Sequence, residues 1–259
     1  MIPKIIHYTW FSQDEMPAKI KSCIESWKRL LPDYELRHWD MNAIKDIDSP
    51  FLKEAIEARK WAYASDFVRL YAIEKFGGIY LDTDVLLFKS LDRFLADSCF
   101  IGVESSIHLN GASGECYLSS HCFGAEPHHP FIQSCLSYFD GRKFIHSKNA
   151  ELPQTMRLNL VLLPYIQSEI AKQWGYDPRP SQRDCRQDLL SGLTIYPRDY
   201  FDPECPTSSS TCFHYAMGSW REGYTAVDML NISKRWSWKL KQALKKFFLK
   251  RGYILTRLN

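Results

Sequence analysis

The sequence lacks the features by which membrane-spanning, secreted and repeat proteins are recognised. No apolar run in the 259 residues approaches the roughly 20 that a spanning helix requires, and there is neither a low-complexity tract nor an internal repeat. The N-terminus shows no charged segment followed by an apolar one, so no signal peptide is visible. We therefore expect a cytoplasmic protein with one substantial globular domain.

Closely spaced cysteine pairs are also missing. The chain has eight cysteines but no C-x-x-C pair, whereas structural zinc sites are built from ligands close together in the sequence. A chain of this length needs no disulfide framework to be stable. We expect free, partly buried cysteines in a reducing compartment.

Acidic residues are absent from one end of the chain. Residues 231–259 contain nine lysines and arginines and no aspartate or glutamate, so the overall net charge of +3 leaves −6 for residues 1–230. This acidic remainder argues against a nucleic-acid-binding protein. Residues 233–252 have the spacing of a basic amphipathic helix with aromatic residues on one face, which predicts binding to an anionic membrane surface. The alternative is a solvated helix that packs its aromatic stripe on the domain.

Residues 1–230 are predicted to form one α/β domain. Apolar patterns predict a strand over 2–10, a helix over 19–31 and a strand over 34–39, a βαβ succession typical of a parallel sheet. A helical region over 51–76 ends at Gly77-Gly78, because glycine readily takes the left-handed conformation after a last turn. A central strand over 79–88 comes next. Weaker patterns predict a strand at 99–103, a helix near 131–138 and a loop over 178–188.

The predicted central strand carries two carboxylates, Asp82 and Asp84. Residues two apart on a strand point to the same side, so both should face one way with Tyr80 beside them. Two neighbouring carboxylates repel each other and resist desolvation unless a cation joins them. Mg²⁺ or Mn²⁺ would satisfy both, since these ions prefer oxygen ligands. The alternative is a strand end at which the two aspartates simply meet water.

The preceding helix adds a third carboxylate and a guanidinium. Asp66 and Arg69 are three residues apart and therefore neighbours on one helical face. An isolated pair of this kind is more often a surface ion pair. Here Gly77-Gly78 ends the helix immediately before the strand, so the connection between them is very short. Both side chains are therefore expected to converge on the pocket of Asp82 and Asp84.

Two runs of residues carry a more specific pattern, supported by shorter matches on either side. The runs are residues 64–69, Ala-Ser-Asp-Phe-Val-Arg, and residues 77–84, Gly-Gly-Ile-Tyr-Leu-Asp-Thr-Asp. The supporting matches are the opening segment 2–10, Trp27, Trp39-Asp40, and His-Tyr-Ala-Met-Gly-Ser-Trp at 214–220. Together these motifs resemble the DXD sugar-binding glycosyltransferases, glycosyltransferase family 32, which include mannosyltransferases and bacterial capsule and lipopolysaccharide transferases. The chain is more distantly similar to the clostridial glucosylating toxins.

The resemblance implies a fold and an activity. The fold would be a GT-A type, Rossmann-like nucleotide-sugar-binding domain with a mostly parallel central sheet. The reaction would be a retaining transfer from a nucleoside diphosphate sugar, with a UDP-sugar expected first and a GDP-sugar second. The acceptor would be a glycan or a lipid-linked glycan in bacterial surface polysaccharide synthesis, with the enzyme peripheral at the inner face of the cell membrane.

The resemblance also implies roles for individual residues. Asp66 and Arg69 would bind hydroxyls of the donor sugar. Trp10 would lie against the nucleobase, and Ser219 and Trp220 would reach the diphosphate. The metal ligands would be Asp82, Asp84 and His214, with Asp82 also between sugar and ribose. A metal and hydrogen-bond donors there would stabilise the charge that builds on the leaving diphosphate.

One departure from the family pattern concerns the acceptor side. Many relatives carry a Gly-Pro pair where this chain reads Glu-Leu-Pro-Gln-Thr at 151–155, so no acceptor specificity carries over. Gln154, Asn110 and Glu126 are further candidates for the pocket. Two rival functions are a catalytically inactive GT-A-fold protein bound at the membrane surface and an aspartyl-phosphate phosphohydrolase. The phosphohydrolase motif D-x-D-x-T would need threonine where Leu86 stands.

Overall fold

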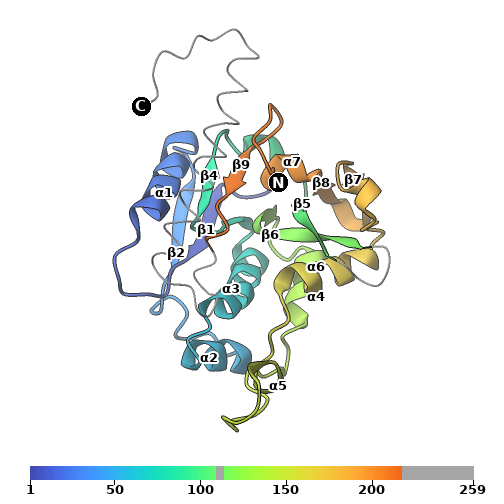
Figure 1. Ribbon diagram of the computed structural model, residues 1–259. Coiled ribbons are helices and arrows are strands. Elements are labelled where there is room, and N and C mark those ends of the chain that lie inside the picture. Colours follow the sequence, from blue (N-terminus) through green and yellow to red (C-terminus); the bar gives the residue numbers. More distant parts are fainter. Residues whose placement is uncertain (109–113, 218–259) are drawn as a thin grey trace.

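The computed structural model describes residues 1–108 and 114–217, which form an α/β fold around a seven-stranded sheet (Figure 1). The strand order is β2-β1-β3-β6-β5-β8-β7, with β2 and β7 at the two edges. The strands are β1 Ile5–Thr9, β2 Glu35–Trp39, β3 Gly78–Leu81, β5 Cys99–His108, β6 Glu115–Ala125, β7 Gln187–Asp188 and β8 Leu193–Tyr196. Two further strands, β4 Val85–Leu87 and β9 Cys212–His214, form a small second sheet.

The main sheet is mostly parallel, as the sequence predicts. β1 is parallel to both β2 and β3, and β5 is parallel to β8. β6 is antiparallel to β3 and to β5, and the short β7 is antiparallel to β8. Strands β1, β2, β3, β5 and β8 therefore run in one direction, and their carboxyl ends share one edge of the sheet.

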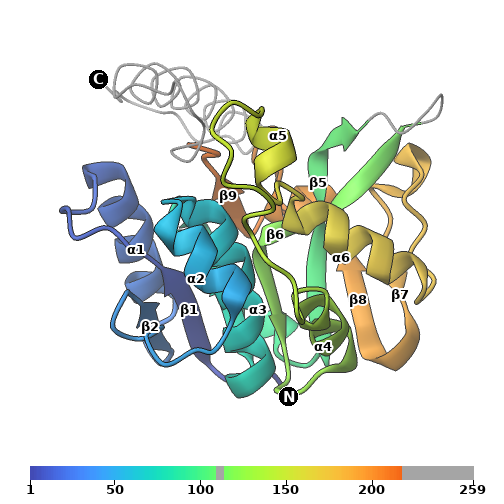
Figure 2. The same cartoon turned by 90° about the horizontal axis from the view of Figure 1, so that it is seen from below.

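Helices cover both faces of the sheet. The helices are α1 Ala18–Leu30, α2 Pro50–Glu57, α3 Trp61–Phe76, α4 Pro130–Ser137, α5 Gln154–Arg157, α6 Leu163–Lys172 and α7 Arg198–Phe201. Three 3₁₀ turns add η1 Asp92–Phe94, η2 Pro180–Gln182 and η3 Leu190–Gly192. Figure 2 shows α2, α3, α4 and α6 gathered over one face, while α1 packs on β4.

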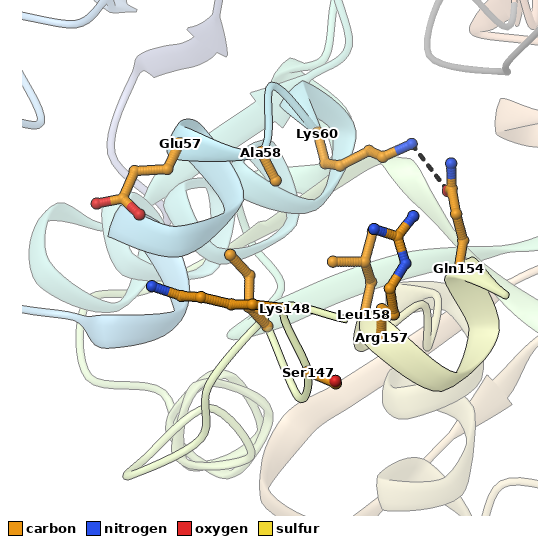
Figure 3. A pocket seen from close by; sticks show the side chains of 9 residues that line it. Glu57, Ala58, Lys60, Ser147, Lys148, Gln154, Arg157 and Leu158 are labelled. Carbon is orange, nitrogen blue, oxygen red and sulfur yellow. Dashed lines mark hydrogen bonds between the residues drawn. The ribbon is translucent and has the colours of Figure 1, made fainter. Parts of the chain in front are cut away.

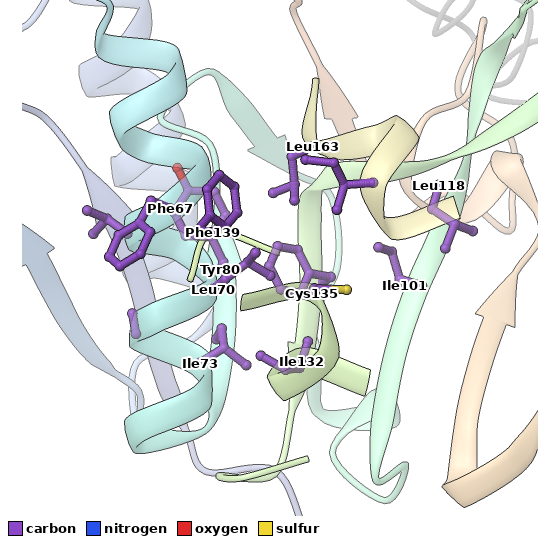
Figure 4. Close-up of a cluster of buried hydrophobic side chains, with 14 of the residues drawn as sticks. Phe67, Leu70, Ile73, Tyr80, Ile101, Leu118, Ile132, Cys135, Phe139 and Leu163 are labelled. Carbon is purple, nitrogen blue, oxygen red and sulfur yellow. The ribbon is translucent and has the colours of Figure 1, made fainter. Parts of the chain in front are cut away.

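Strand β3 lies between two hydrophobic cores. Tyr80 packs into the core beneath α3, together with Phe67, Leu70 and Ile73 (Figure 4). Its neighbours Ile79 and Leu81 point the other way, into the core that includes Trp27 of α1. A strand that buries both faces reads as a continuous apolar run, because neither side meets water.

Gly77 and Gly78 join α3 to β3 without a loop. Gly77 ends the helix with its N–H on the Ile73 carbonyl at 2.8 Å, and both glycines have positive φ, 62° and 98°. A Cβ on Gly78 would lie 2.7 Å from the Ile5 carbonyl oxygen of the neighbouring strand. The predicted glycine stop is therefore confirmed, and it fixes α3 directly against β3.

Several predicted boundaries are wrong. The predicted helical region over 51–76 is divided into two helices, since Arg59 takes a positive φ of 54° between α2 and α3. The strand over 79–88 ends at Leu81, turns through the two aspartates and resumes as β4 in a different sheet. The loop over 178–188 contains η2 and ends in β7.

All eight cysteines are free, and six of them are buried. Over residues 1–108 and 114–217, no helix combines the length and apolar character needed to cross a membrane. The predicted tail at 231–259, with its amphipathic segment at 233–252, lies outside the described residues.

Candidate active site

The two aspartates of the D-x-D motif lie at the carboxyl edge of the sheet. Asp82 directly follows β3, and Trp10 directly follows the parallel neighbour β1. In open α/β sheets this edge is where ligands usually bind. Trp10 is half-buried, and its indole N–H donates to the Asp14 carbonyl at 3.3 Å.

A tight turn, rather than a strand, brings Asp82 and Asp84 together. The Val85 N–H closes the turn on the Asp82 carbonyl at 3.0 Å, and the Asp82 N–H donates to the His121 carbonyl at 2.9 Å. The predicted reason for their convergence, alternation along one strand, is wrong. The predicted convergence itself is present, because the turn folds both side chains toward the same space.

The segment at and after β9 completes the turn. β4 and β9 pair so that Val85 lies opposite His214. The Tyr215 N–H donates to the Asp84 carbonyl at 3.1 Å, and the Met217 N–H donates to Asp84 Oδ2 at 2.9 Å. Asp84 is thereby fixed by backbone groups from a distant part of the chain.

Asp82, Asp84 and His214 form a group that fits a divalent cation. One ligand atom from each residue lies within 4.8 Å of the others. His214 Nε2 is 3.3 Å from Asp84 Oδ1 and 4.0 Å from Asp82 Oδ2. Two carboxylates and one imidazole suit Mn²⁺ well and Mg²⁺ less well, since imidazole is the softer ligand.

Charge is strongly coupled within this group. Burial opposes ionisation of both partners, yet the attraction between them prevails, so the pKa of Asp84 is lowered. Desolvation likewise works against the His214 imidazolium, but Asp84 and then Asp82 raise the pKa of His214 to about 9. Without a metal, a proton on His214 supplies the positive charge that the carboxylates require.

Asp66 and Arg69 form a buried ion pair beside the metal group. Arg69 Nη2 lies 3.1 Å from Asp66 Oδ1 and 3.3 Å from Asp82 Oδ1. Burial raises the pKa of Asp66 to about 6, although Arg69 acts in the opposite direction. A backbone hydrogen bond from Leu163, the first residue of α6, also favours the Asp66 carboxylate. The expected convergence is present, and the pair does not lie on the surface.

Arg69 uses most of its N–H groups on protein partners. Nη1 donates to the Ser120 carbonyl at 2.8 Å, Nη2 to Ser65 Oγ at 3.1 Å and Nε to the Ser65 carbonyl at 3.3 Å. Its guanidinium also lies over the Tyr80 ring, 4.5 Å from the centroid. Arg69 is thus a fixed bridge between two carboxylates.

A cluster of hydroxyl groups supports Asp82 from beneath. The Tyr80 hydroxyl donates to Asp82 Oδ1 at 3.0 Å, and it also contacts Ser65 Oγ at 2.9 Å and Thr9 Oγ1 at 3.1 Å. The sequence places Tyr80 near the aspartates, but it gives no sign of Thr9 or Ser65. These two residues come from β1 and α3, and only the fold brings them together.

His121 and Asp202 are two further residues at the site that the sequence did not reveal. The His121 ring stacks on His214 with centroids 4.1 Å apart and planes 25° apart. His121, Asp202 and His214 form a second group whose ligand atoms lie close enough for a metal ion. The available signal was the polar run Ser-Ser-His at 119–121 inside an otherwise apolar strand.

The remaining candidates fall in different places. Ser219, Trp220 and Asn110 lie outside the described residues. Glu126 is wrong as a pocket residue, because it follows Ala125, which pairs with Gly78 at the opposite edge of the sheet. Its carboxylate forms an ion pair with the N-terminal amine instead. Gln154 begins α5 and accepts a hydrogen bond from Lys60 at 3.1 Å.

Part of the chain that forms this site is similar to a known protein family. Residues 17–101 match the family model described as "Glycosyltransferase sugar-binding region containing DXD motif". This stretch includes Asp66, Arg69, Asp82 and Asp84. This stretch of the chain is therefore similar to the DXD sugar-binding region of glycosyltransferases, and the resemblance drawn from its motifs is confirmed.

Individual relatives are glycosyltransferases from several sources. Inositol phosphoceramide mannosyltransferase 3 of Schizosaccharomyces pombe is 33% identical over 51% of this chain and 35% of its own length. Human alpha-1,4-N-acetylglucosaminyltransferase is 36% identical over 43% of this chain and 26% of its own length. An uncharacterized glycosyltransferase of Acanthamoeba polyphaga mimivirus is 27% identical over 85% of this chain and 84% of its own length. The chain thus spans about a third of the first relative and nearly all of the viral one.

Proposed function

We propose that this protein is a metal-dependent, retaining glycosyltransferase that takes its sugar from a nucleoside diphosphate sugar. A UDP-sugar is the first candidate donor and a GDP-sugar the second. The observation that carries the proposal is the convergence of Asp82, Asp84 and His214 at the carboxyl edge of the sheet, within 4.8 Å of one another. The match of the surrounding sequence to the DXD sugar-binding region supports it.

In this proposal Asp82, Asp84 and His214 hold Mn²⁺ or Mg²⁺. The ion would act as a Lewis acid toward the departing diphosphate. The fixed geometry of Asp84 matters here, because a ligand held by backbone N–H groups needs little reorganisation when the cation binds. The Tyr80 hydroxyl keeps Asp82 oriented in the same way.

The family resemblance implies that both Asp66 and Arg69 contact hydroxyls of the donor sugar. Asp66 is ionised above a pH of about 6, and its carboxylate then accepts hydrogen bonds from donor hydroxyls. Arg69 already donates to Ser65 and Ser120, which favours orientation of Asp66 and Asp82 as its main role. Trp10 would stack on the nucleobase, while Ser219 and Trp220 would reach the diphosphate, as the family resemblance implies.

The proposed acceptor is a glycan or a lipid-linked glycan. Relatives from yeasts carry names that refer to inositol phosphoceramide or to mannosyl phosphorylinositol ceramide, both of them lipids. We propose a role in bacterial surface polysaccharide synthesis, with residues 233–252 on an anionic membrane surface at the inner face of the cell membrane. The basic, acid-free composition of that segment supports this placement.

Donor hydrolysis tests the proposal directly. A panel of UDP- and GDP-sugars is incubated with Mn²⁺ and the full chain, and nucleotide release is measured with and without EDTA. We expect slow release from one donor, abolished by EDTA and lowered at least about 100-fold by Asp84→Asn. The matched control Asp46→Asn changes an exposed aspartate outside the site and should leave release unchanged. If no donor is bound or hydrolysed, the inactive GT-A-fold binding protein becomes the better description.

A further inference from the structure

A pocket lies apart from the residues of the candidate active site and is lined by none of them. Its volume is about 490 Å³, and it is framed by the end of α2, the start of α3 and the segment 145–158 (Figure 3). That volume falls within the range of small-molecule sites in proteins. The pocket is therefore large enough for a sugar unit with a charged substituent.

The lining of this pocket is predominantly cationic. Lys60, Lys148 and Arg157 line it, against one carboxylate, Glu57. Figure 3 shows Glu57 across the pocket from Arg157 and Lys60, whose amine reaches toward Gln154. Over the described residues, neither Lys148 nor Arg157 forms an ion pair with a carboxylate.

The Nε atom of Arg157 indicates that this pocket could bind a ligand. This atom is buried and has no hydrogen-bond partner within the described part of the chain. A buried donor without a partner is unfavourable, so such groups usually meet a ligand or water. The guanidinium as a whole lines the pocket, and a guanidinium binds phosphate and carboxylate groups through two parallel hydrogen bonds.

The segment that carries Arg157 is anchored to the domain. The Ile145 N–H donates to Glu54 Oε2 at 2.8 Å, and the His146 N–H donates to the Arg157 carbonyl at 2.7 Å. Ile145 and Leu158 form a β-bridge. Arg157 is thus held in place by α2 and by its own hairpin, as a preformed binding site requires.

The pocket and the candidate active site share helix α3. Lys60 caps the helix, and Asp66 lies six residues further on, roughly 9 Å along the axis at 1.5 Å per residue. Asp66 also contacts the first residue of α6, Leu163, just beyond the pocket residue Leu158. The pocket and Asp66 are therefore linked through the same helix and through the segment that leads into α6.

We propose that this pocket is the acceptor subsite for an anionic sugar unit, one that carries a phosphate or a carboxylate. Arg157 and Lys148 bind the oxyanion, and the neutral part of the acceptor extends along α3 toward Asp66 and Asp82. That the bound sugar is an acceptor rests on the proposed function. The preference for an anionic sugar rests on the pocket alone.

Direct binding of simple sugars tests the preference. Calorimetric titrations of the full chain use glucose 6-phosphate, glucuronate, glucose and inorganic phosphate. We expect the two anionic sugars to bind at least tenfold more tightly than glucose. Arg157→Met and Lys148→Met should each remove most of that difference, whereas Lys143→Met, an exposed lysine of the same region outside the pocket, should preserve it. Lys148 is itself exposed, so its variant tests the pocket without disturbing a buried group.

Each other outcome has a defined meaning. Equal binding of glucose and its anionic forms, or unchanged binding in both pocket variants, overturns the proposal. Inorganic phosphate that binds as tightly as glucose 6-phosphate overturns the sugar subsite as well. Donor hydrolysis is measured on the same preparations: its absence, with anionic sugar binding retained, overturns the glycosyltransferase proposal alone.

Discussion

Asp84 Oδ1 lies 3.3 Å from His214 Nε2, so the turn after β3 and the strand β9 share one proton or one cation. The two occupants exclude each other, because an imidazolium cannot bind a metal. Because the pKa of His214 is raised, a proton competes with the metal ion for this imidazole.

The first prediction concerns that competition. The pKa of His214 is raised to about 9 in the metal-free protein, so the proton is present at neutral pH and must leave when Mn²⁺ binds. We expect about one proton released per Mn²⁺ at pH 7.5, and an affinity that falls roughly tenfold for each pH unit below 9. Titration calorimetry in buffers of different ionisation enthalpy measures the release. His214→Gln is the control, and proton release that persists in it would contradict the assignment.

The second prediction concerns Arg69, which bridges Asp66 and Asp82. Arg69→Met leaves the buried Asp66 and the half-buried Asp82 without their counter-charge and should lower the free energy of unfolding by about 3–5 kcal/mol. Arg69→Lys keeps the charge but cannot reach Ser65 and Ser120 together, so an intermediate loss is expected. Urea denaturation measures both. Lys28→Met removes an exposed ion pair with Glu25 and should cost far less, because water screens exposed charges. A similar small cost for Arg69→Met would refute the bridging role.

The third prediction concerns His121, whose ring lies on His214. If His121 orients the His214 ring, His121→Ala should weaken Mn²⁺ binding by about 10- to 100-fold. His121→Phe keeps an aromatic ring in the stack and should recover most of the affinity. Were His121 itself a metal ligand, phenylalanine would fail as badly as alanine. Mn²⁺ titration of the three proteins in the presence of UDP separates the two possibilities.

The fourth prediction concerns Gly78 at the start of β3. Gly78→Ala combines a positive φ of 98° with a Cβ placed 2.7 Å from the Ile5 carbonyl, so the parallel pair β1 and β3 must separate. We expect a loss of more than about 3 kcal/mol in unfolding free energy. Gly141→Ala is a matched control, because its φ is also positive but nothing lies within 4 Å of the added atom. It should cost only about 1 kcal/mol, and equal losses in the two variants would disprove the packing argument.

The sequence was most informative where one local rule determined the structure. Gly77-Gly78 marked the end of α3, and the apolar run after it marked β3. Asp66 and Arg69 were placed together by helical spacing alone. These predictions succeeded because each feature depends on neighbours in the chain, and the matched family motif runs through the same elements.

The sequence failed where distant contacts decide the structure. Aspartate favours turns, but the turn at Asp82–Asp84 is stabilised by the carbonyl of His121 and by the N–H groups of Tyr215 and Met217, which the local sequence does not reveal. Glu126 was misplaced since the direction of β6 cannot be read from its composition. His121 was missed because a histidine in a buried strand is usually structural, and only the stack on His214 shows otherwise.

The position of Asp84 depends on residues 212–217, and this has a consequence for the order in which the site forms during synthesis. The D-x-D motif leaves the ribosome long before residues 212–217, which provide the imidazole and the two backbone donors that hold Asp84. A nascent or truncated chain that stops before Cys212 contains the whole motif but lacks these groups. Cation affinity should therefore arise late in synthesis, and a fragment that carries the motif alone is a poor guide to what the finished protein binds.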